Sequence, residues 1–231
     1  MGRTWGYSIE GEGRGLTHNN FVRPLTDFSQ LRDVPGSSLF AVAEQFFSIQ
    51  GEGYWTGTPA WFIRLQGCSV GCPWCDSKST WQAKSPGFAL ADIVRGIPYS
   101  ARHVVITGGE PYEQDIRRLL YAIYRTGRRV QIETSGCYDV YGPEWITVSP
   151  KFFKPLSIQA LQAANEIKQV IASPSDLEQF FEKVMPNVRQ FVHVYLQPVS
   201  NGSRVLKLCI EACKKHGFSL SLQTHKLIGI P

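Results

Sequence analysis

The segment Gly67-Cys68-Ser69-Val70-Gly71-Cys72-Pro73-Trp74-Cys75-Asp76 places three cysteines in the spacing C-x-x-x-C-x-x-C. Cysteine thiolates are the protein ligands of iron–sulfur clusters. A cluster of the 4Fe-4S type held by only three thiolates keeps one iron open to an outside ligand. The segment therefore predicts a reactive iron–sulfur centre at Cys68, Cys72 and Cys75. The alternative is a structural zinc site, which needs four ligands and would take the fourth from Cys137 or a distant histidine.

A second motif, Thr107-Gly108-Gly109-Glu110-Pro111, follows the apolar run 103–106, which predicts a buried strand. Two glycines allow the backbone to approach a ligand closely, and the Glu110 carboxylate can accept hydrogen bonds from an ammonium group. Together with the three cysteines, and with Trp74 just before the third, this motif resembles the radical S-adenosylmethionine (SAM) superfamily. The resemblance implies that the open iron binds the amino and carboxylate groups of SAM.

The composition indicates one globular domain. The chain has 231 residues, of which 43% are hydrophobic, enough to bury a sizeable core. Six cysteines would suit a disulfide framework only in a small secreted protein. We find no secretory signal and no apolar run long enough to cross a membrane. We therefore expect a cytoplasmic protein with no membrane partner. Cys209 and Cys213 lie one turn apart on the apolar face of a predicted helix, and we expect them to pack in the protein core.

The charge pattern bears on partners. The chain has a formal charge of +5 at pH 7, and its basic residues are scattered apart from a few pairs. Nucleic-acid binding needs a concentrated basic face with interleaved aromatic residues, so we expect no nucleic-acid partner. A modestly basic surface can steer an acidic electron donor such as flavodoxin or ferredoxin.

Strand and helix patterns alternate along the chain. Apolar runs predict strands at 61–65, 103–106, 129–133, 145–148, 166–171, 191–196 and 220–223, and helical patterns fall at 89–96, 111–126, from 173 onward and at 203–216. This alternation predicts an α/β fold with a mainly parallel sheet. The length leaves too few units for eight-fold closure, so we expect a partial, incomplete TIM-like (β/α) barrel of the radical SAM type. Residues 1–42 are expected to form a poorly ordered extension, and 43–231 a single catalytic domain.

Further motifs narrow the resemblance. They are FSIQGEGYWTG at 47–57, FIRLQG at 62–67, QIETSG at 131–136, VSPK at 148–151, LQP at 196–198 and QTHK at 223–226. In this order they resemble the 7-carboxy-7-deazaguanine synthase family. The resemblance implies a homodimeric enzyme of queuosine and 7-deazapurine biosynthesis. It would contract the ring of 6-carboxy-5,6,7,8-tetrahydropterin with loss of ammonia, using SAM and a 4Fe-4S cluster.

The resemblance also implies three sets of site residues beside the cluster cysteines. The residues around SAM would be Trp74, Cys75, Asp76, Gly108, Gly109, Glu110, Ser135, Ser149, Pro150, Lys151 and Gln197. The residues around the substrate would be Ile49, Gln50, Gly51, Glu52, Arg64, Thr107, Glu133, His225 and Pro231, the last through its terminal carboxylate. Magnesium would be bound near the third cysteine, where the family typically has threonine and this chain has Ser77.

The residue types suit a pterin. A carboxylate such as Glu133 or Glu52 can accept two N–H bonds from the aminopyrimidinone edge, and the planar fork of Arg64 matches the substrate carboxylate, with His225 as a second partner. Each residue also has an ordinary explanation: Arg64 as a salt-bridged strand residue, Glu52 as a turn acid, His225 as a satisfied polar side chain. The combination in family order favours the substrate site.

Two other classes of protein share part of this pattern. Another radical SAM enzyme, such as a glycyl-radical activase, would share the cysteines and the Gly-Gly-Glu-Pro motif. Such an activase has no evident use for Glu52, Arg64, Glu133 and His225. A non-enzymatic zinc or iron–sulfur binding module is the second alternative, and the brown colour of an iron–sulfur protein separates its two forms.

Overall fold

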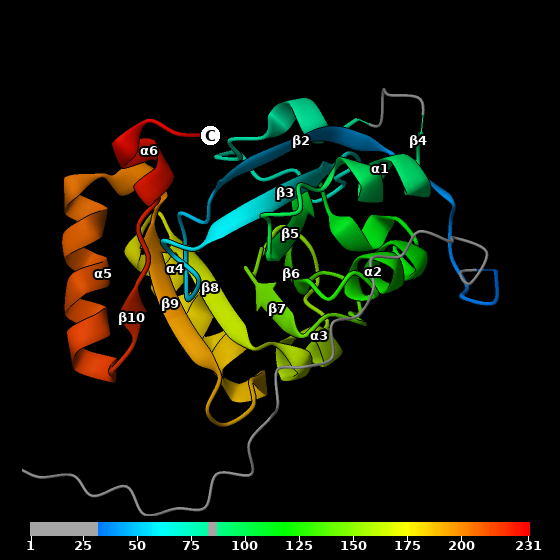
Figure 1. The fold of residues 1–231 in the computed structure, drawn as a ribbon. Helices are drawn as coiled ribbons and strands as arrows, with labels where there is room; N and C mark the ends of the chain where they lie inside the picture. Colours follow the sequence, from blue (N-terminus) through cyan, green and yellow to red (C-terminus); the bar gives the residue numbers. More distant parts are fainter. Residues whose placement is uncertain (1–31, 83–86) are drawn as a thin grey trace, which may run out of the picture.

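The computed structural model describes residues 32–82 and 87–231. Within them, eight strands form one sheet in the order β10-β9-β8-β7-β6-β5-β3-β2, which curves around the molecule as an open barrel (Figure 1). The strands are β2 (Val42–Ile49), β3 (Pro59–Leu65), β5 (His103–Gly108), β6 (Arg129–Thr134), β7 (Trp145–Val148), β8 (Glu166–Ile171), β9 (His193–Pro198) and β10 (Ser219–Leu220). Within this eight-stranded sheet only the β2–β3 pairing is antiparallel, so the predicted α/β partial barrel is confirmed.

Helices connect the strands and cover the outside of the sheet (Figure 1). They are α1 (Leu90–Gly96), α2 (Arg117–Tyr124), α3 (Ile158–Ala163), α4 (Pro174–Gln179), α5 (Ser203–His216) and α6 (Thr224–Ile228), with shorter turns at η2 (Lys78–Thr80), η3 (Pro111–Glu113), η4 (Phe180–Val184), η5 (Met185–Asn187) and η6 (Val199–Asn201). A capping box formed by Ser173 and Asp176 starts α4, and Gly217 ends α5 in the left-handed conformation that glycine adopts most readily. No helix among the described residues is both long and apolar enough to span a bilayer.

The core consists of two groups of buried side chains on the outer face of the sheet. One lies under α1 and α2 and includes Ile63, Val104 and Ile123, and the other lies under α3 to α5 and includes Val148 and Phe180. Cys209 and Cys213 of α5 are buried in the second group, which confirms their predicted packing role. These helices leave the carboxyl ends of the strands free for a site.

Several elements differ from the sequence prediction. The helix predicted at 111–126 is broken into η3 and α2 because Gln114 is extended and uses its side chain elsewhere. Its amide accepts from Ala41 N at 2.9 Å and donates to the carbonyls of Ala41 at 3.1 Å and Gln66 at 2.9 Å. The strand predicted at 220–223 ends at Leu220 because the chain turns into α6 at Gln223. The strand predicted at 191–196 is displaced to His193–Pro198.

The sequence analysis did not predict β2, α3 or α6. It also placed 32–42 in an extension, whereas in the structure this segment packs on the domain. β1 (Leu39–Phe40) pairs with β4 (Phe88–Ala89), and Phe40 and Val42 are each only 1% exposed. The remainder of that predicted extension, 1–31, lies outside the described residues.

Candidate active site

The carboxyl ends of the strands surround a cavity of about 480 Å³. Every site residue that the sequence analysis named lines it, except Pro150, which is buried between the lining residues Ser149 and Lys151. The structure therefore gathers segments that lie as far apart in sequence as Ile49 and Pro231 around one space. The lining also contains residues that the sequence analysis missed, among them Lys168, Gln223 and Lys226.

The three-cysteine loop forms one wall of this cavity. Cys68, Cys72 and Cys75 are free thiols, and Cys75 N donates to Cys72 O at 3.1 Å in a tight turn. Burial raises the pKa of the Cys72 thiol to about 11; Lys151 opposes this, and Cys68 and Cys75 raise it further. When thiols grouped in this way bind a cation, they lose their protons and bind it as thiolates.

The donor set suits an iron–sulfur cluster. Cys68, Cys72 and Cys75 all line one cavity, and its lining contains no fourth cysteine; Cys137 donates its thiol to Lys151 O at 3.7 Å. Among residues 32–82 and 87–231, no three His, Cys, Asp or Glu side chains are already gathered closely enough to hold a metal ion. The loop thus supplies the chemistry of a three-thiolate site.

The Gly-Gly-Glu-Pro motif lines the cavity and also packs within the protein. A Cβ atom on Gly108, which has φ +104°, would lie 2.5 Å from the Leu65 backbone, and one on Gly109 would lie 2.0 Å from Gly67 O. The glycines therefore let the end of β5 pack against the chain that enters the cysteine loop, and their approach to a ligand stays a prediction.

Glu110 is likewise engaged within the protein. Its buried carboxylate accepts from Thr134 Oγ1 at 2.7 Å, from Ser135 N at 2.8 Å and Oγ at 2.5 Å, and from Tyr112 N at 3.2 Å. These bonds tie the carboxyl ends of β5 and β6 together beside the cysteine loop.

The opposite part of the cavity contains a buried charged trio, Glu52–Lys168–Glu133. Lys168 Nζ lies 2.5 Å from Glu52 Oε2 and 3.1 Å from Glu133 Oε2, and its side chain is 4% exposed. Burial would raise the pKa of Glu52, but Lys168 and Gln223 hold it below the usual range. The Glu52 carboxylate is therefore an ionised acceptor at neutral pH. Gln50 Nε2 donates to Glu133 Oε1 at 2.8 Å and completes the wall.

The loop that carries Glu52 also closes the inside of the barrel beneath the cavity. Gly53 N donates to Ser221 Oγ at 3.0 Å, and Gly53 itself is so close to Glu166 that a Cβ atom would lie 1.9 Å from Glu166 Oε1. Tyr54 and Trp55 then pack with Trp145, at ring-centroid distances of 4.6 and 5.1 Å. This loop holds Glu52 in place by filling the space below it.

Arg64 and the residues after the third cysteine form the rim of the cavity. Arg64 Nε donates to Glu44 Oε1 at 2.7 Å, and Arg64 Nη1 donates to Ser77 Oγ at 3.0 Å. Asp76 accepts from Lys226 Nζ at 2.8 Å. Burial alone would raise the pKa of Asp76, but the bond to Lys226 lowers it, so this carboxylate is also ionised.

Lys151 and Gln197 lie on the side of the cavity formed by β7 and β9. Lys151 Nζ donates to Ser149 O at 2.9 Å and to the Ser149 hydroxyl, and lies 5.1 Å from the Trp74 ring centre. Burial lowers the pKa of Lys151 to about 8. Gln197 Oε1 accepts from Ser221 Oγ at 2.7 Å.

His225 is placed by α6, an element that the sequence analysis did not predict. Thr224 N donates to Gly51 O at 3.0 Å, and a Cβ atom on Gly51 would lie 2.2 Å from His225 Nδ1, so only glycine admits this contact. Pro231 lines the same end of the cavity, where its carbonyl oxygen accepts from Ser48 Oγ at 2.7 Å.

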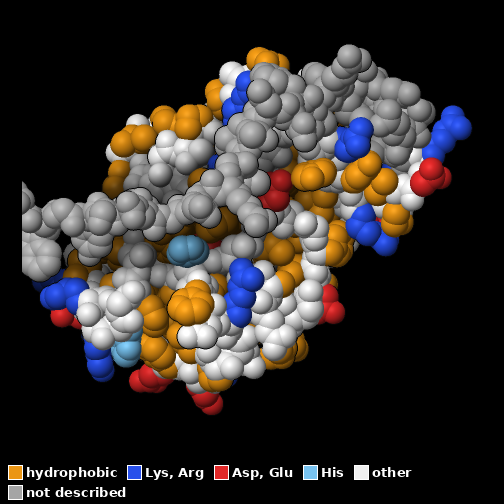
Figure 2. All heavy atoms as spheres, turned by 60° about the horizontal axis from the view of Figure 1, so that its bottom comes forward, with side chains coloured by type: hydrophobic (Ala, Val, Ile, Leu, Met, Phe, Trp, Pro, Cys, Tyr) orange, Lys and Arg blue, Asp and Glu red, His pale blue; other side chains and the backbone are white. Residues whose placement is uncertain are grey.

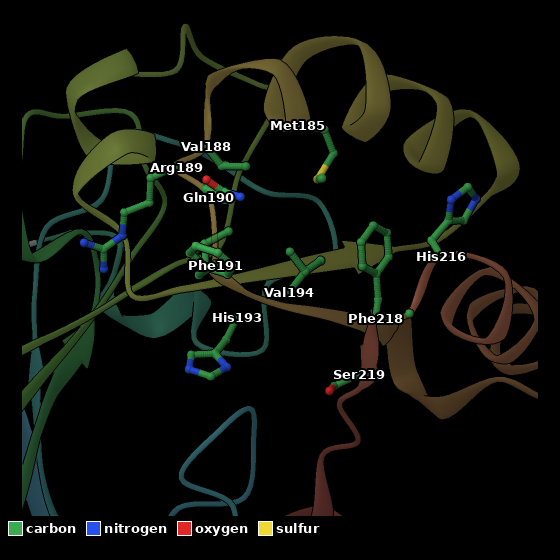
Figure 3. Close-up of a pocket in the computed structure, with 12 residues that line it drawn as sticks. Met185, Val188, Arg189, Gln190, Phe191, His193, Val194, His216, Phe218 and Ser219 are labelled. Carbon is green, nitrogen blue, oxygen red and sulfur yellow. The ribbon is translucent and has the colours of Figure 1, made fainter. Parts of the chain in front are cut away.

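A second cavity, of about 590 Å³, lies at the amino ends of β9 and β10. Its lining includes Met185, Phe191, His193, His216 and Phe218, and Figure 3 shows these side chains around the opening. None of the predicted site residues lines it, so its larger volume does not mark the active site. Figure 2 views the molecule from this end and shows lysine and arginine side chains scattered over that face.

Comparison with known proteins gives the family. The chain is 41% identical to the 7-carboxy-7-deazaguanine synthase of Escherichia coli (strain K12) over 222 residues, which cover 83% of this chain and 99% of that protein. It is 36% identical to the synthase of Synechocystis sp. over 197 residues, covering 83% and 93% of the two chains. The crystal structure of QueE from Escherichia coli matches with a TM-score of 0.74 and 38% identity, over 80% of this chain and 93% of that one. The chain matches no protein-family model. On the strength of these relatives and of the shared fold, the chain belongs to the 7-carboxy-7-deazaguanine synthase family.

Proposed function

We propose that this protein is a radical SAM lyase that converts 6-carboxy-5,6,7,8-tetrahydropterin into 7-carboxy-7-deazaguanine with loss of ammonia. The observation that carries the proposal is the single cavity. It joins the three-cysteine loop to the carboxylates of Glu52 and Glu133, and Arg64 lies at its rim. An enzyme that modified a partner protein would have no need for such a buried carboxylate wall.

In this proposal Cys68, Cys72 and Cys75 would hold a 4Fe-4S cluster, and residues at the ends of β5, β6, β7 and β9 would hold SAM. When bound, the cluster and SAM would supply the radical chemistry that removes a hydrogen atom from the substrate. The surrounding side chains position the two molecules and keep water from the radical. The residues assigned to SAM are Trp74, Cys75, Asp76, Gly108, Gly109, Glu110, Ser135, Ser149, Pro150, Lys151 and Gln197.

The substrate occupies the carboxylate wall. Glu52 and Glu133 accept N–H bonds from the aminopyrimidinone edge, because ionised carboxylates offer only acceptor atoms. Arg64 and His225 bind the substrate carboxylate at the rim. The remaining substrate contacts are assigned to Ile49, Gln50, Gly51, Thr107 and Pro231.

Magnesium binds at Ser77 in the same proposal. The Ser77 hydroxyl lies on the cavity lining, 3.0 Å from Arg64 Nη1 and 3.2 Å from Asp76 Oδ1. One hydroxyl oxygen, supplemented by water and by substrate carboxylate oxygens, matches the oxygen ligands that magnesium takes. We further propose a homodimer that receives electrons from flavodoxin or ferredoxin.

An anaerobic reaction tests the proposal. The protein is loaded with iron and sulfide and given SAM, magnesium, a reductant and 6-carboxytetrahydropterin, and the mixture is examined by mass spectrometry. We expect 7-carboxy-7-deazaguanine. Accumulation of 5′-deoxyadenosine without that product would remove the substrate assignment, and the absence of both would contradict the radical SAM chemistry.

A further inference from the structure

One buried cation in the cavity has no part in the residue assignments above. Lys168 lies on β8 between the buried residues Ile167 and Gln169, and is 3% exposed. A lysine is almost never buried to this degree unless it is paired. Its ammonium group contacts Glu52 on the loop after β2 and Glu133 on β6, which lie 116 and 35 residues away in the sequence.

We propose that Lys168 is a positioning residue for substrate recognition, and this inference rests on the proposed function. Held between Glu52 and Glu133, its ammonium group aims both carboxylates into the cavity as acceptors for the N–H groups of the substrate ring. The two carboxylates then select ligands that carry several N–H donors along one edge.

The geometry supports this role because two carboxylates share a single counter-ion. Each carboxylate keeps a second oxygen that an amide holds in orientation: Gln223 Nε2 donates to Glu52 Oε1 at 2.9 Å, and Gln50 Nε2 donates to Glu133 Oε1 at 2.8 Å. Both carboxylates line the cavity beside Lys168. Two carboxylates left close together without a cation would compete for a proton, and one of them would become a hydrogen-bond donor.

The electrostatic surroundings agree with this role. Burial would lower the pKa of Lys168, but Glu133, Glu52 and Glu166 raise it above its ordinary value, so the ammonium group stays charged. The other titratable groups that act on this trio are Lys151 after β7, His225 on α6 and His103 on β5. Among the described residues, Lys168 is the one in direct ionic contact with both Glu52 and Glu133.

The test is the affinity of the cluster-loaded, full-length protein for 6-carboxypterin, a stable analogue of the substrate, measured by calorimetry at several pH values. The Kd of the unaltered protein between about pH 5.5 and about pH 7.5 is the reference, because other groups near the site, Glu166 among them, also titrate in this range. Lys168→Met should bind about tenfold more weakly, and the ratio of its Kd to that of the unaltered protein should rise as the pH falls, because one carboxylate is protonated there. Lys168→Arg, which keeps the charge, should restore a constant ratio.

Two further variants sharpen the comparison. Glu52→Gln added to Lys168→Met removes the competing carboxylate, so the pH dependence should disappear while the affinity stays low. Lys214→Met, which breaks an exposed ion pair with Glu211 on α5, is the control and should bind as the unaltered protein does. Should Lys168→Met not fold, Lys168→Gln carries the same comparison.

A ratio between the Kd of Lys168→Met and that of the unaltered protein that does not change with pH would overturn the inference, since a merely structural lysine would change stability without adding a titration. Failure of the unaltered protein to bind 6-carboxypterin would instead overturn the proposed function, and this inference with it.

Discussion

Replacement of Gly53 by alanine should destabilise the protein far more than the same change four residues later. Gly53 has φ +67°, and Gly57 in the same loop has φ +89°. Alanine in the left-handed region costs about 1 kcal/mol at either position. The two sites differ in their surroundings, because a Cβ atom at Gly57 meets nothing within 4 Å, whereas one at Gly53 would lie 1.9 Å from Glu166 Oε1.

The additional loss at Gly53 follows from what holds Glu166. Its side chain is buried, and its Oε2 accepts from Trp145 Nε1 at 3.2 Å, from Thr147 Oγ1 at 3.3 Å and from Tyr54 N at 3.4 Å. To admit a methyl group the carboxyl must move by more than an ångström and break some of these bonds, which costs about 1–3 kcal/mol more. We therefore expect Gly53→Ala to lose about 2–4 kcal/mol and Gly57→Ala about 1 kcal/mol.

Urea unfolding, followed by circular dichroism, measures both variants against the unaltered protein. Each lost kcal/mol should also lower the thermal midpoint by about 3 °C in a chain of this size. Equal losses in Gly53→Ala and Gly57→Ala would show that the contact with Glu166 is unimportant and would refute this account of how the loop closes the barrel.

Three other outcomes are expected. Cys68→Ala should fail to retain the iron and the absorption near ~400 nm after reconstitution, whereas Cys209→Ala, buried in α5, should retain both; equal iron contents would count against the cysteine assignment. Arg64→Lys should raise KM for the carboxylated substrate roughly tenfold with less effect on kcat, because the planar fork is lost. Arg95→Lys, which alters an exposed ion pair, should not change KM. Equal changes of KM in the two variants, measured by steady-state kinetics, would argue for a general charge effect. Burial raises the pKa of the Glu166 carboxyl to about 7 from 4.5, so its contribution to stability is complete below pH 4.5 and is lost as the pH rises toward 7. Relative to Glu166→Gln, the unfolding free energy of the unaltered protein should therefore fall by roughly 3 kcal/mol across this range in urea titrations; parallel curves for the two proteins would show that Glu166 does not bind its proton more tightly in the folded state.

Much of the fold could be predicted because buried parallel strands have strong local signals. The apolar runs of β7 and β8 gave their observed bounds, and Thr107, Glu133, Ser149 and Gln197 do lie at the cavity where parallel strands end. Edge strand β2 was not predicted because one of its faces is largely exposed. The break at Gln114 was not predicted because the local sequence of 111–126 is typical of one continuous helix. That break depends on contacts with Ala41 and Gln66, which are distant in sequence.

The cavity lining was predicted from motifs, but the way in which its residues work together was not. Glu52 and Lys168 meet only after the sheet has formed, so no local pattern indicates their pairing. The one available signal was a lysine within a strand expected to be buried. The glycines of the Gly-Gly-Glu-Pro motif also show why composition alone is insufficient, since they pack against Leu65 and Gly67.

The most direct test of the account is a crystal structure of the cluster-loaded protein with SAM and 6-carboxypterin. The account predicts the pterin in the cavity of about 480 Å³, with its aminopyrimidinone edge on Glu52 and Glu133 and its carboxylate at Arg64. A pterin bound in the cavity beside Phe191, or one turned so that its carboxylate faces the Glu52–Lys168–Glu133 trio, would contradict it.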